Sequence, residues 1–490
     1  MSLPLCAADV LGEHVVFELD CIDRMYCNAY VRKLTYPGGV ASFFTHHRGA
    51  TFASTALADP ISKRFVAAIQ DYAVDHKVPV VRFVKGQRKD DVAHEHLARF
   101  GDREGVYMIG VAQEKIGTFR TEKRRNPETG VRYPWIVRAS AVVNQYYCYA
   151  QDVDFGPFFV KFSSYFPYGA KLCFNGHHWA QRQAQAAGIA FGELDNGFVD
   201  CADPAALQRI CDRLSPAKID ALFRKWLARL PHPFTPADRR AGYRYELSVL
   251  QAEFSRTQVL DRPQSGRIFF EHLIRENLDL GRPDQVSLIF GRRVRTRGRR
   301  PTPSRFRTRV LTADVSPSIH VDYKHSKIKQ YHKLGRAIRT ETTINDTRDF
   351  AIGKRLKNLP ALRQVGFAAN RRLLATQRLG HDPIAAARVF TSVTEPATIG
   401  DTRVAGLRFG DPRAMALLSL LAVFRLSVRG FTNRELRQHL APLLGLTPGA
   451  MTAGQVTYDL RRLRLHGLIA RIPHTNRYLP TQDGLRTALV

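Results

Sequence analysis

The sequence of 490 residues lacks several features that would place it in a familiar class. Its seven cysteines include no C-x-x-C pair, which argues against a zinc ribbon or knuckle, and their odd number argues against a disulfide framework. The first residues carry neither a basic leader nor a secretory apolar core, so we expect a cytoplasmic protein with reduced thiols. The apolar run at 414–424 is far too short to span a bilayer, and we expect no membrane partner.

Acidic residues are scarce relative to basic ones. The chain has 44 Asp and Glu against 74 Lys and Arg, which gives a net charge of +30. Such an excess attracts polyanions, and we expect DNA or RNA as the partner. The densest basic block, 291–310, holds nine arginines and no acid. Blocks of this kind often bind nucleic acid, although a solvated linker without a partner is the simpler interpretation. Its candidate phosphate-binding residues are Arg292, Arg293, Arg295, Arg297, Arg299 and Arg300.

The last eighty residues have the pattern of a winged helix-turn-helix. Helices are predicted at 413–428, 433–444 and 455–466, and two short strands follow at 468–473 and 477–480. Thr432 and Glu435 have the spacing of a capping box at the start of the second helix. A basic third helix followed by a hairpin is the geometry that places a helix in the DNA major groove. A domain used only for protein contacts is the alternative.

The register of the predicted third helix separates apolar from basic side chains. Val456, Leu460 and Leu463 fall on one helical face. The arginines that lie mostly outside that face, and that we expect to bind nucleic acid, are Arg461, Arg462 and Arg464.

The rest of the chain is predicted to be a mixed α+β, multidomain body of the α/β class, because strand and helix patterns alternate over the first 110 residues. Residues 118–133 are predicted as a basic loop between strands at 106–111 and 136–149. We divide the chain into an N-terminal mixed α/β domain, a mainly helical region, an Arg-rich linker, a basic β-hairpin and helical region, and the winged helix-turn-helix, at 1–203, 204–290, 291–310, 311–404 and 405–490 respectively.

The densest polar cluster lies at 319–350. Strands are predicted at 320–333 and 336–345, on either side of a turn at Leu334 and Gly335. Because alternate residues of a strand share one face, this hairpin would bring a tyrosine, lysines, an arginine and a carboxylate together. The residues concerned are Lys329, Tyr331, Lys333, Arg339 and Glu341.

These residues form the string K-x-Y-x-K-x-G-x-x-x-R-x-E, which resembles the tyrosine region of rolling-circle replication initiators from plasmids and phages. The resemblance implies a tyrosine that attacks a DNA phosphate and forms a phosphotyrosine link, helped by a divalent metal. The His-hydrophobe-His strand usual in those proteins is absent, and the nearest match is His320-Val321-Asp322 beside the tyrosine. The chain as a whole is also similar to a widespread group of bacterial proteins, a likeness that implies no function.

The chemistry is physically coherent. Tyrosine is a poor nucleophile at its ordinary pKa of about 10 and needs a neighbouring cation or base. Lys329 and Lys333 would favour the phenolate, and Mg²⁺ or Mn²⁺ held by Asp322 and Glu341 could polarise the phosphate oxygens. The simpler interpretation is a basic hairpin that only binds phosphates, with Glu341 paired to Arg339 or Lys333.

A second candidate site lies in the first predicted strand. Glu18 and Asp20 alternate onto one face and Asp23 follows. A two-metal nuclease with an RNase H-like core places a carboxylate in its first strand and needs several more acids. The distant acids that could supply them are Asp152, Asp154 and Asp195. Ordinary exposed acids on strands and turns are the alternative.

Two hypotheses follow. The first is a DNA-processing protein of mobile-element or replication type that nicks or joins strands. The second is a non-enzymatic DNA- or RNA-binding protein with a winged-helix module.

Overall fold

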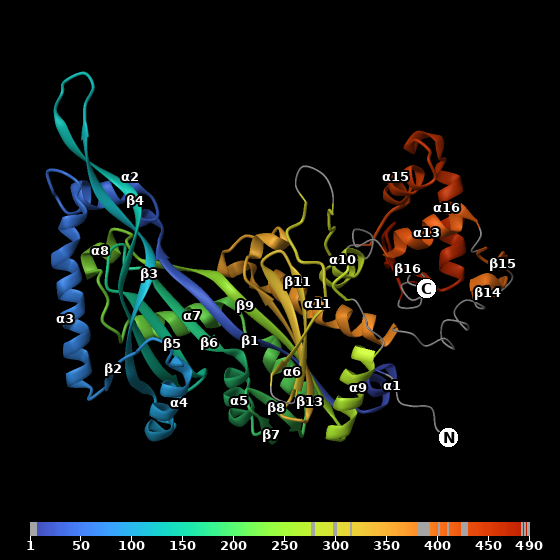
Figure 1. The fold of residues 1–490 in the computed structure, drawn as a ribbon, viewed down its shortest axis with the longest axis horizontal. Coiled ribbons are helices and arrows are strands. Elements are labelled where there is room, and N and C mark those ends of the chain that lie inside the picture. Colours follow the sequence, from blue (N-terminus) through green and yellow to red (C-terminus); the bar gives the residue numbers. More distant parts are fainter. Residues whose placement is uncertain are drawn as a thin grey trace. The chain divides into compact units, whose positions relative to one another are not determined.

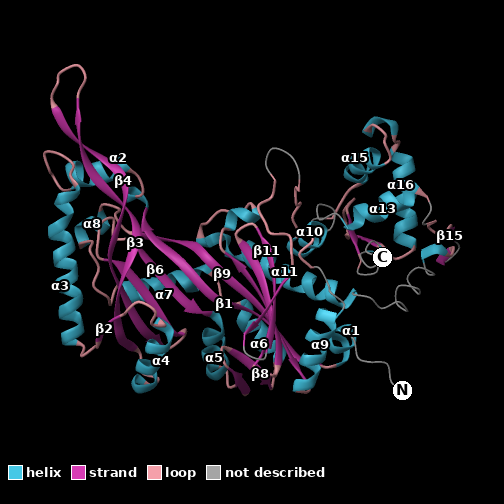
Figure 2. Cartoon of the chain, in the orientation of Figure 1, coloured by secondary structure: helices cyan, strands magenta, loops and turns pink. Residues whose placement is uncertain are grey.

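The computed structural model of the chain describes residues 7–275, 280–296, 301–313, 316–379, 393–399, 402–408, 411–422 and 430–481, together with residues 484 and 487 (Figure 1). The architecture is mixed α/β, as expected (Figure 2). Within the described ranges, no helix is long and apolar enough to cross a membrane. The chain folds into two compact units that interleave in sequence: unit 1 contains residues 1–18, 256–342 and 364–490, and unit 2 contains residues 19–255 and 343–363.

Unit 2 is built on a mixed sheet whose strands follow the order β9-β1-β6-β5-β4-β3-β2. The pairs β1–β6, β6–β5, β5–β4 and β4–β3 are antiparallel, whereas β2 pairs with β3 in parallel. One face of this sheet carries a cluster of aromatic side chains, among them Tyr107, Tyr147, Tyr149 and Phe159, against which α4 packs. The strands are β1 Val15–Val31, β2 Val80–Arg82, β3 Gly105–Arg125, β4 Arg132–Asp152, β5 Gly156–Ser163, β6 Ala170–Asn175 and β9 Tyr245–Leu260, of which β1 and β9 also contribute residues to unit 1; β7 Phe191–Leu194 and β8 Gly197–Cys201 form a separate hairpin.

Three helices of unit 2, α6, α7 and α8, begin after a side-chain cap that is followed by proline. Asp203, Ser215 and Thr235 each accept a hydrogen bond from a backbone N–H of the first turn, and each is followed by proline, which suits the first helical position. The helices are α2 Pro37–Ser42, α3 Asp59–Asp75, α4 Lys89–Phe100, α5 Gly176–Ala186, α6 Pro204–Asp212, α7 Pro216–Leu227 and α8 Pro236–Arg240.

The segment predicted as a basic loop, 118–133, is instead part of a long β-hairpin. β3 and β4 are each 21 residues long and stay in register from Ile109–Cys148 to Arg125–Arg132. β5 pairs with β4 only from Gln145 onward, so the preceding part of β4 pairs with β3 alone. Figure 1 shows this two-stranded arm projecting beyond the other strands of unit 2. The loop prediction was therefore wrong, apart from the turn itself.

Unit 1 contains a second set of strands, in the order β10-β11-β12-β13-β9. β10–β11 and β11–β12 are antiparallel. One face of β12 and β13 carries buried polar side chains that bond to α11: Gln330 donates to Gln377 (Nε2–Oε1, 2.9 Å), and Thr342 donates to Asn370 (Oγ1–Oδ1, 2.6 Å). The elements are α1 Ala7–Glu13, α9 Pro263–Arg275, α10 Pro283–Phe290, β10 Arg309–Ala313, β11 Ser316–Tyr323, β12 Ser326–Lys333, β13 Ala337–Ile344 and α11 Leu359–Leu379, the last two of which cross into unit 2.

The C-terminal part of unit 1 is a small helical cluster with its own core. Thr432 and Thr452 start their helices with complete capping boxes, the first of which was expected from the sequence. Residues of all three helices share one buried cluster, which includes Leu417, Leu436 and Leu460. The elements are β14 Ala397–Ile399, β15 Thr402–Val404, α13 Pro412–Ala422, α15 Asn433–Leu443, α16 Ala453–Leu465, β16 Ile469–Arg471 and β17 Tyr478–Pro480.

The interleaved units differ from the consecutive segments inferred from the sequence. The helices at 204–227 belong to the same compact unit as the strands before them, and the first 18 residues belong with residues beyond 255. In the Arg-rich block, β10 begins at Arg309, whereas 297–300 lie outside the described residues.

Candidate functional site

The polar cluster at 319–350 forms a β-meander. Leu334 and Gly335 have positive φ values of 48° and 66° and make the turn between β12 and β13, as predicted. The first predicted strand, 320–333, is divided in two, because the chain reverses at Lys324, whose φ is 53°, and forms β11 and β12. Ser318, on β11, consequently lies opposite Tyr331 in register.

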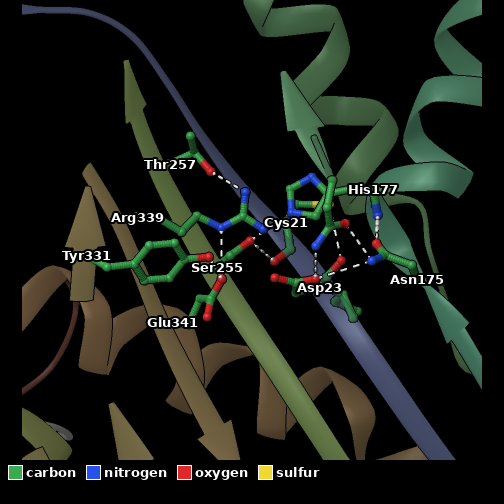
Figure 3. A network of polar contacts seen from close by, with 11 residues as sticks. Cys21, Asp23, Asn175, His177, Ser255, Thr257, Tyr331, Arg339 and Glu341 are labelled. Carbon is green, nitrogen blue, oxygen red and sulfur yellow. Dashed lines mark hydrogen bonds and ion pairs between the residues drawn. The ribbon is translucent and has the colours of Figure 1, made fainter. Parts of the chain in front are cut away.

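Tyr331, Glu341 and Arg339 contact one another, as the strand alternation predicted (Figure 3). The Tyr331 hydroxyl donates to Glu341 Oε1 at 2.8 Å. Arg339 Nε lies 3.3 Å from the same carboxylate oxygen. Arg339 is fully buried and its Nη1 donates to Thr257 Oγ1 at 2.9 Å, so the guanidinium is held from two sides. The carboxylate is therefore fixed next to the phenol.

Lysine side chains of β12 lie on the same strand face as this tyrosine. Lys329 Nζ lies 4.2 Å from the centroid of the Tyr331 ring, within cation–π range. Lys327 is exposed on the same face, because it is two residues from Lys329 on the strand. Lys333 was predicted to lie beside the tyrosine, but it is only 8% exposed and occupies the last position before the turn. Lys329 is thus the predicted lysine that the structure places against the ring.

His320 reports the positive character of this face. It lies opposite Lys329 in register and its Nε2 is 3.0 Å from Ser318 Oγ. Burial lowers the pKa of His320, and the charges of Arg309, Lys329 and Lys327 lower it further against the opposing effect of Asp322. The positions of Arg309, Lys329 and Lys327 around this imidazole make the face basic, which suits a phosphate group.

Asp322 and Glu341, the two acids predicted to hold a metal, have separate partners. Arg309 Nη2 lies 2.9 Å from both carboxylate oxygens of Asp322. Glu341, on β13, is bonded to Tyr331 and paired with Arg339. Asp322 is on β11, and β12 lies between these two strands. Neighbouring strands are about 4.8 Å apart, so acids two strands apart are about 10 Å apart along the sheet. The described residues contain no group of three or more His, Cys, Asp or Glu side chains placed to hold an ion. These two acids do not fit a shared metal.

Two functional neighbours were not found from the sequence. Thr257 comes from β9, which is distant in sequence from the tyrosine hairpin. Arg309 comes from β10, which a turn and β11 separate from that hairpin. Arg309 belongs to the Arg-rich block at 291–310, which the sequence singled out for nucleic-acid binding, but the ion pair of Arg309 with Asp322 was not predicted. Only the strand order of the sheet brings these residues to the site.

The N-terminal acids do not form the expected two-metal cluster. Asp20 and Asp23 are buried rather than exposed, and Asp23 accepts a hydrogen bond from Asn196 Nδ2 at 2.9 Å. Asp152 Oδ2 lies 2.7 Å from both Lys225 Nζ and Trp226 Nε1. Figure 3 shows Asp23 beside Asn175, whose side chain caps α5 by accepting from the His177 backbone N–H. The carboxylates of Asp23 and Asp152 thus accept hydrogen bonds from donors within unit 2, which is compatible with their burial.

The basic side chains of α16 divide into two groups. Arg461 and Arg464 are exposed, together with Thr457 and Tyr458, while Val456, Leu460 and Leu463 are buried as predicted. Arg462 differs from the expectation, because it is half-buried and donates to the backbone carbonyl oxygens of Ala405 and Gly406. Arg462 therefore anchors the segment that precedes α13.

The arginines of the block at 291–310 lie in part within the described residues. Arg292 is half-buried, and Arg293 and Arg295 are exposed. Arg297, Arg299 and Arg300 lie outside the described residues. Comparisons with protein-family models, curated proteins and solved structures gave no match to this chain.

Proposed function

We propose that the chain is a nucleic-acid-binding protein of mobile-element or replication type, which cuts and rejoins DNA strands through Tyr331. The observation that carries this proposal is the 2.8 Å hydrogen bond from the Tyr331 hydroxyl to Glu341, whose carboxylate Arg339 holds in place. A nucleophile within reach of a base, with the base oriented by a third group, is the arrangement that activates hydroxyl nucleophiles. The resemblance to rolling-circle initiators points to the same tyrosine.

The proposed reaction is a transesterification. The Tyr331 oxygen forms a bond to phosphorus, the bond from phosphorus to a deoxyribose oxygen breaks, and Glu341 accepts the phenolic proton. The departing oxygen takes a proton and leaves a free hydroxyl on the cut strand. Reversal of these steps rejoins the strand, so neither cutting nor joining consumes a nucleotide. The phosphotyrosine link conserves the energy of the original phosphodiester.

The cations beside the tyrosine have a defined part in this scheme. Lys329 lies over the ring and Lys327 is exposed two residues away, so both can approach the charged oxygens of a phosphate bound at Tyr331. Charge fixed in advance where negative charge develops is a large source of catalysis. A divalent cation, Mg²⁺ or Mn²⁺, remains a prediction of the resemblance. No step above depends on it, because Asp322 and Glu341 do not share a site.

We further propose that α13, α15, α16 and the β16–β17 hairpin form a winged helix-turn-helix that binds DNA. The support is the order of these elements, the antiparallel β16–β17 pair after the third helix, and the exposed Arg461 and Arg464 on that helix. In helix-turn-helix proteins, residues toward the start of the recognition helix contact base edges. The exposed residues in that part of α16 are Ala453, Gly454, Gln455, Thr457 and Tyr458.

The alternative is a non-enzymatic DNA- or RNA-binding protein. It is favoured by the fact that Glu341 already has Arg339 as a counter-ion, so the Tyr331–Glu341 bond also serves as an ordinary cross-strand contact. Under this alternative, Lys327 and Lys329 bind phosphates without any reaction. The two hypotheses differ in one product, a covalent protein–DNA adduct.

The test uses the full-length protein with end-labelled single-stranded and double-stranded DNA, each with and without Mg²⁺ or Mn²⁺. We expect cleavage and a labelled band that survives denaturing electrophoresis. Tyr331→Phe should abolish both and leave affinity nearly unchanged, because only the hydroxyl is removed. Tyr30→Phe is the matched control, because Tyr30 is also half-buried on a strand, and it should retain full activity.

Two results would decide against the proposed chemistry. Cleavage by Tyr331→Phe at the wild-type rate would exclude Tyr331 as the nucleophile. Binding by the wild-type protein without cleavage or adduct, on every substrate and with either metal, would favour the non-enzymatic alternative. A chelator that has no effect on wild-type cleavage would show that the divalent cation is dispensable.

A further inference from the structure

The β3–β4 arm has an end that pairs with no other strand among the described residues. At its base, Thr121 Oγ1 accepts a hydrogen bond from the Thr55 backbone N–H at 2.8 Å. Arg138 Nη2 donates to the Thr35 backbone oxygen at 2.8 Å, and Phe119 and Ile136 are buried. These contacts brace the outer part of the arm, residues 120–138, at its inner end, so the remainder of it is held out from the rest of unit 2 (Figure 1).

The outer part of the arm is strongly basic. Residues 120–138 contain six Lys or Arg and two Glu. All six basic side chains are exposed. Glu122 accepts from Arg120 at 2.7 Å, and its other oxygen lies 3.9 Å from Arg124. The acids therefore neutralise only part of the charge, and a net charge of +4 is concentrated on a short projecting hairpin.

The register sorts the side chains of the arm onto two faces. Arg124 lies opposite Tyr133, and Glu122 lies opposite Trp135, so these four share one face. The other face carries Lys123, Arg125 and Arg132. One face thus carries the two aromatic rings with Arg124 and Glu122, and the other carries three basic residues together with Pro134, which lies opposite Lys123.

The aromatic residues are exposed, which is unusual for side chains of this size. Tyr133 is 38% exposed and Trp135 is 45% exposed. They pack edge to face with centroids 6.2 Å apart, and the Arg124 guanidinium lies 5.1 Å from the Trp135 centroid. These contacts hold the rings in place on the arm without burying them, and so prepare them for a partner.

We infer that the β3–β4 arm inserts into a groove of double-stranded DNA. This inference rests on the proposed nucleic-acid binding and adds a second contact surface, in unit 2. A two-stranded β-ribbon fits the major groove, whose walls are lined by phosphates. Lys123, Arg125 and Arg132 would contact those phosphates, and Tyr133 and Trp135 would contact sugars and base edges.

The arrangement favours a duplex over a single strand. Proteins that bind single strands stack successive bases on open aromatic faces. On this arm, Arg124 covers one face of Trp135 and the edge contact with Tyr133 occupies its side. A narrow ribbon with basic residues on one face and aromatic rings on the other can instead contact both the phosphates that line a groove and the base edges within it.

The three tryptophans of the chain provide a specific probe. Trp179 and Trp226 are 2% and 1% exposed, so Trp135 is the tryptophan that solvent reaches. Addition of duplex DNA to the full-length protein should quench the Trp135 emission and protect it from acrylamide. Trp135→Phe should remove that response and leave the emission of the two buried rings. A wild-type response that persists in Trp135→Phe would overturn the inference.

Charge variants provide the second measurement. In Lys123→Ala/Arg125→Ala/Arg132→Ala, the slope of log affinity against log salt should fall by about 2 to 3 units, because each phosphate contact contributes about 0.9. The matched control is Lys63→Ala/Lys218→Ala/Arg99→Ala, which removes the same charge from exposed positions of unit 2 outside the arm. The control should keep a slope within about one unit of the wild-type value.

The outcomes separate the arm from the proposed function. A wild-type protein that binds neither DNA nor RNA would overturn both. A wild-type protein that binds duplex DNA, with equal slopes in the arm and control variants, would overturn the arm alone. A response of Trp135 to single strands, RNA, acidic protein or anionic vesicles, but not to duplex DNA, would also overturn it.

Discussion

The ion pair between Arg339 and Glu341 should make the stability of unit 1 sensitive to the loss of a single charge. Arg339 is fully buried, and Glu341 is only 14% exposed. Glu341→Gln keeps the shape of the side chain and removes its charge, so that the guanidinium stays buried, keeps its bond to Thr257 and loses the Glu341 carboxylate. Arg339→Met removes the guanidinium and leaves the carboxylate, which Tyr331 still contacts.

The expected magnitudes differ between these variants. A buried charge that loses its partner costs about 3–5 kcal/mol, so Glu341→Gln should lower the free energy of unfolding by about that amount. In a domain of about 150–250 residues, this corresponds to a fall of roughly 10 °C in Tm. Tyr331→Phe removes one hydrogen bond to a carboxylate and should cost only about 1.5–3 kcal/mol. Replacement of both charged residues should cost less than the sum of the two single changes.

A double-mutant cycle measures this coupling. The four proteins are the wild type, Arg339→Met, Glu341→Gln and the double variant, compared by urea unfolding and by calorimetry. A coupling free energy of at least about 1.5 kcal/mol is expected, because the residues touch. Costs that add to within about 0.5 kcal/mol would refute the reasoning and show that the two charges are stabilised independently. The same data tell whether loss of cleavage in Glu341→Gln reflects chemistry or unfolding.

Two further predictions concern α16 and unit 2. Arg461→Ala should lower the slope of log affinity for DNA against log salt by about one unit, because Arg461 is exposed. Arg462→Ala should instead lower the Tm of the C-terminal helices, because its guanidinium bonds to backbone carbonyls. Binding titrations and calorimetry measure the two effects, and the reverse pattern would contradict the helical register of α16. Burial of Glu114 disfavours its charge, but hydrogen bonds from Lys161, Tyr147 and Lys89 outweigh this effect and lower its pKa to about 2. The stability that this carboxylate contributes should be present above about pH 4.5 and lost toward pH 2. The free energies of unfolding of the wild type and Glu114→Gln should therefore converge as the pH falls. A constant difference between them over that range would contradict the assignment.

Local sequence patterns predicted contacts made within one hairpin or one helix. Tyr331 and Glu341 meet because the turn at Leu334 is short and strand alternation is regular, so that few registers were possible. Leu460 and Leu463 are buried because a 3.6-residue period determines which face of α16 packs. The Thr432 capping box was readable for the same reason, since its partners are three residues apart.

Contacts between distant segments could not be predicted in this way. Thr257 reaches Arg339 only because β9 pairs beside β13, and no periodicity encodes that neighbour. The β3–β4 arm was mistaken for a loop because a strand with two exposed faces has no alternation of apolar and polar residues. Asp20 and Asp23 are buried, so the alternative of ordinary exposed acids was also wrong for them, and Asp23 bonds to an amide donor far away in sequence, Asn196.

The interleaving of the two units in sequence affects the order in which they can fold during synthesis on the ribosome. His14 bonds to Asp261, 247 residues later, and Arg378 donates to the Leu11 backbone oxygen. At a synthesis rate of about 5–20 residues per second, the N-terminal segment waits roughly 12–50 s for its first partners. Unit 2 has nearly all of its residues available by then, and it can condense before the partners of residues 7–18 in unit 1 have been made. Residues 7–18 are thus made long before the residues they pack against, and during that period the nascent chain carries an unpaired strand edge.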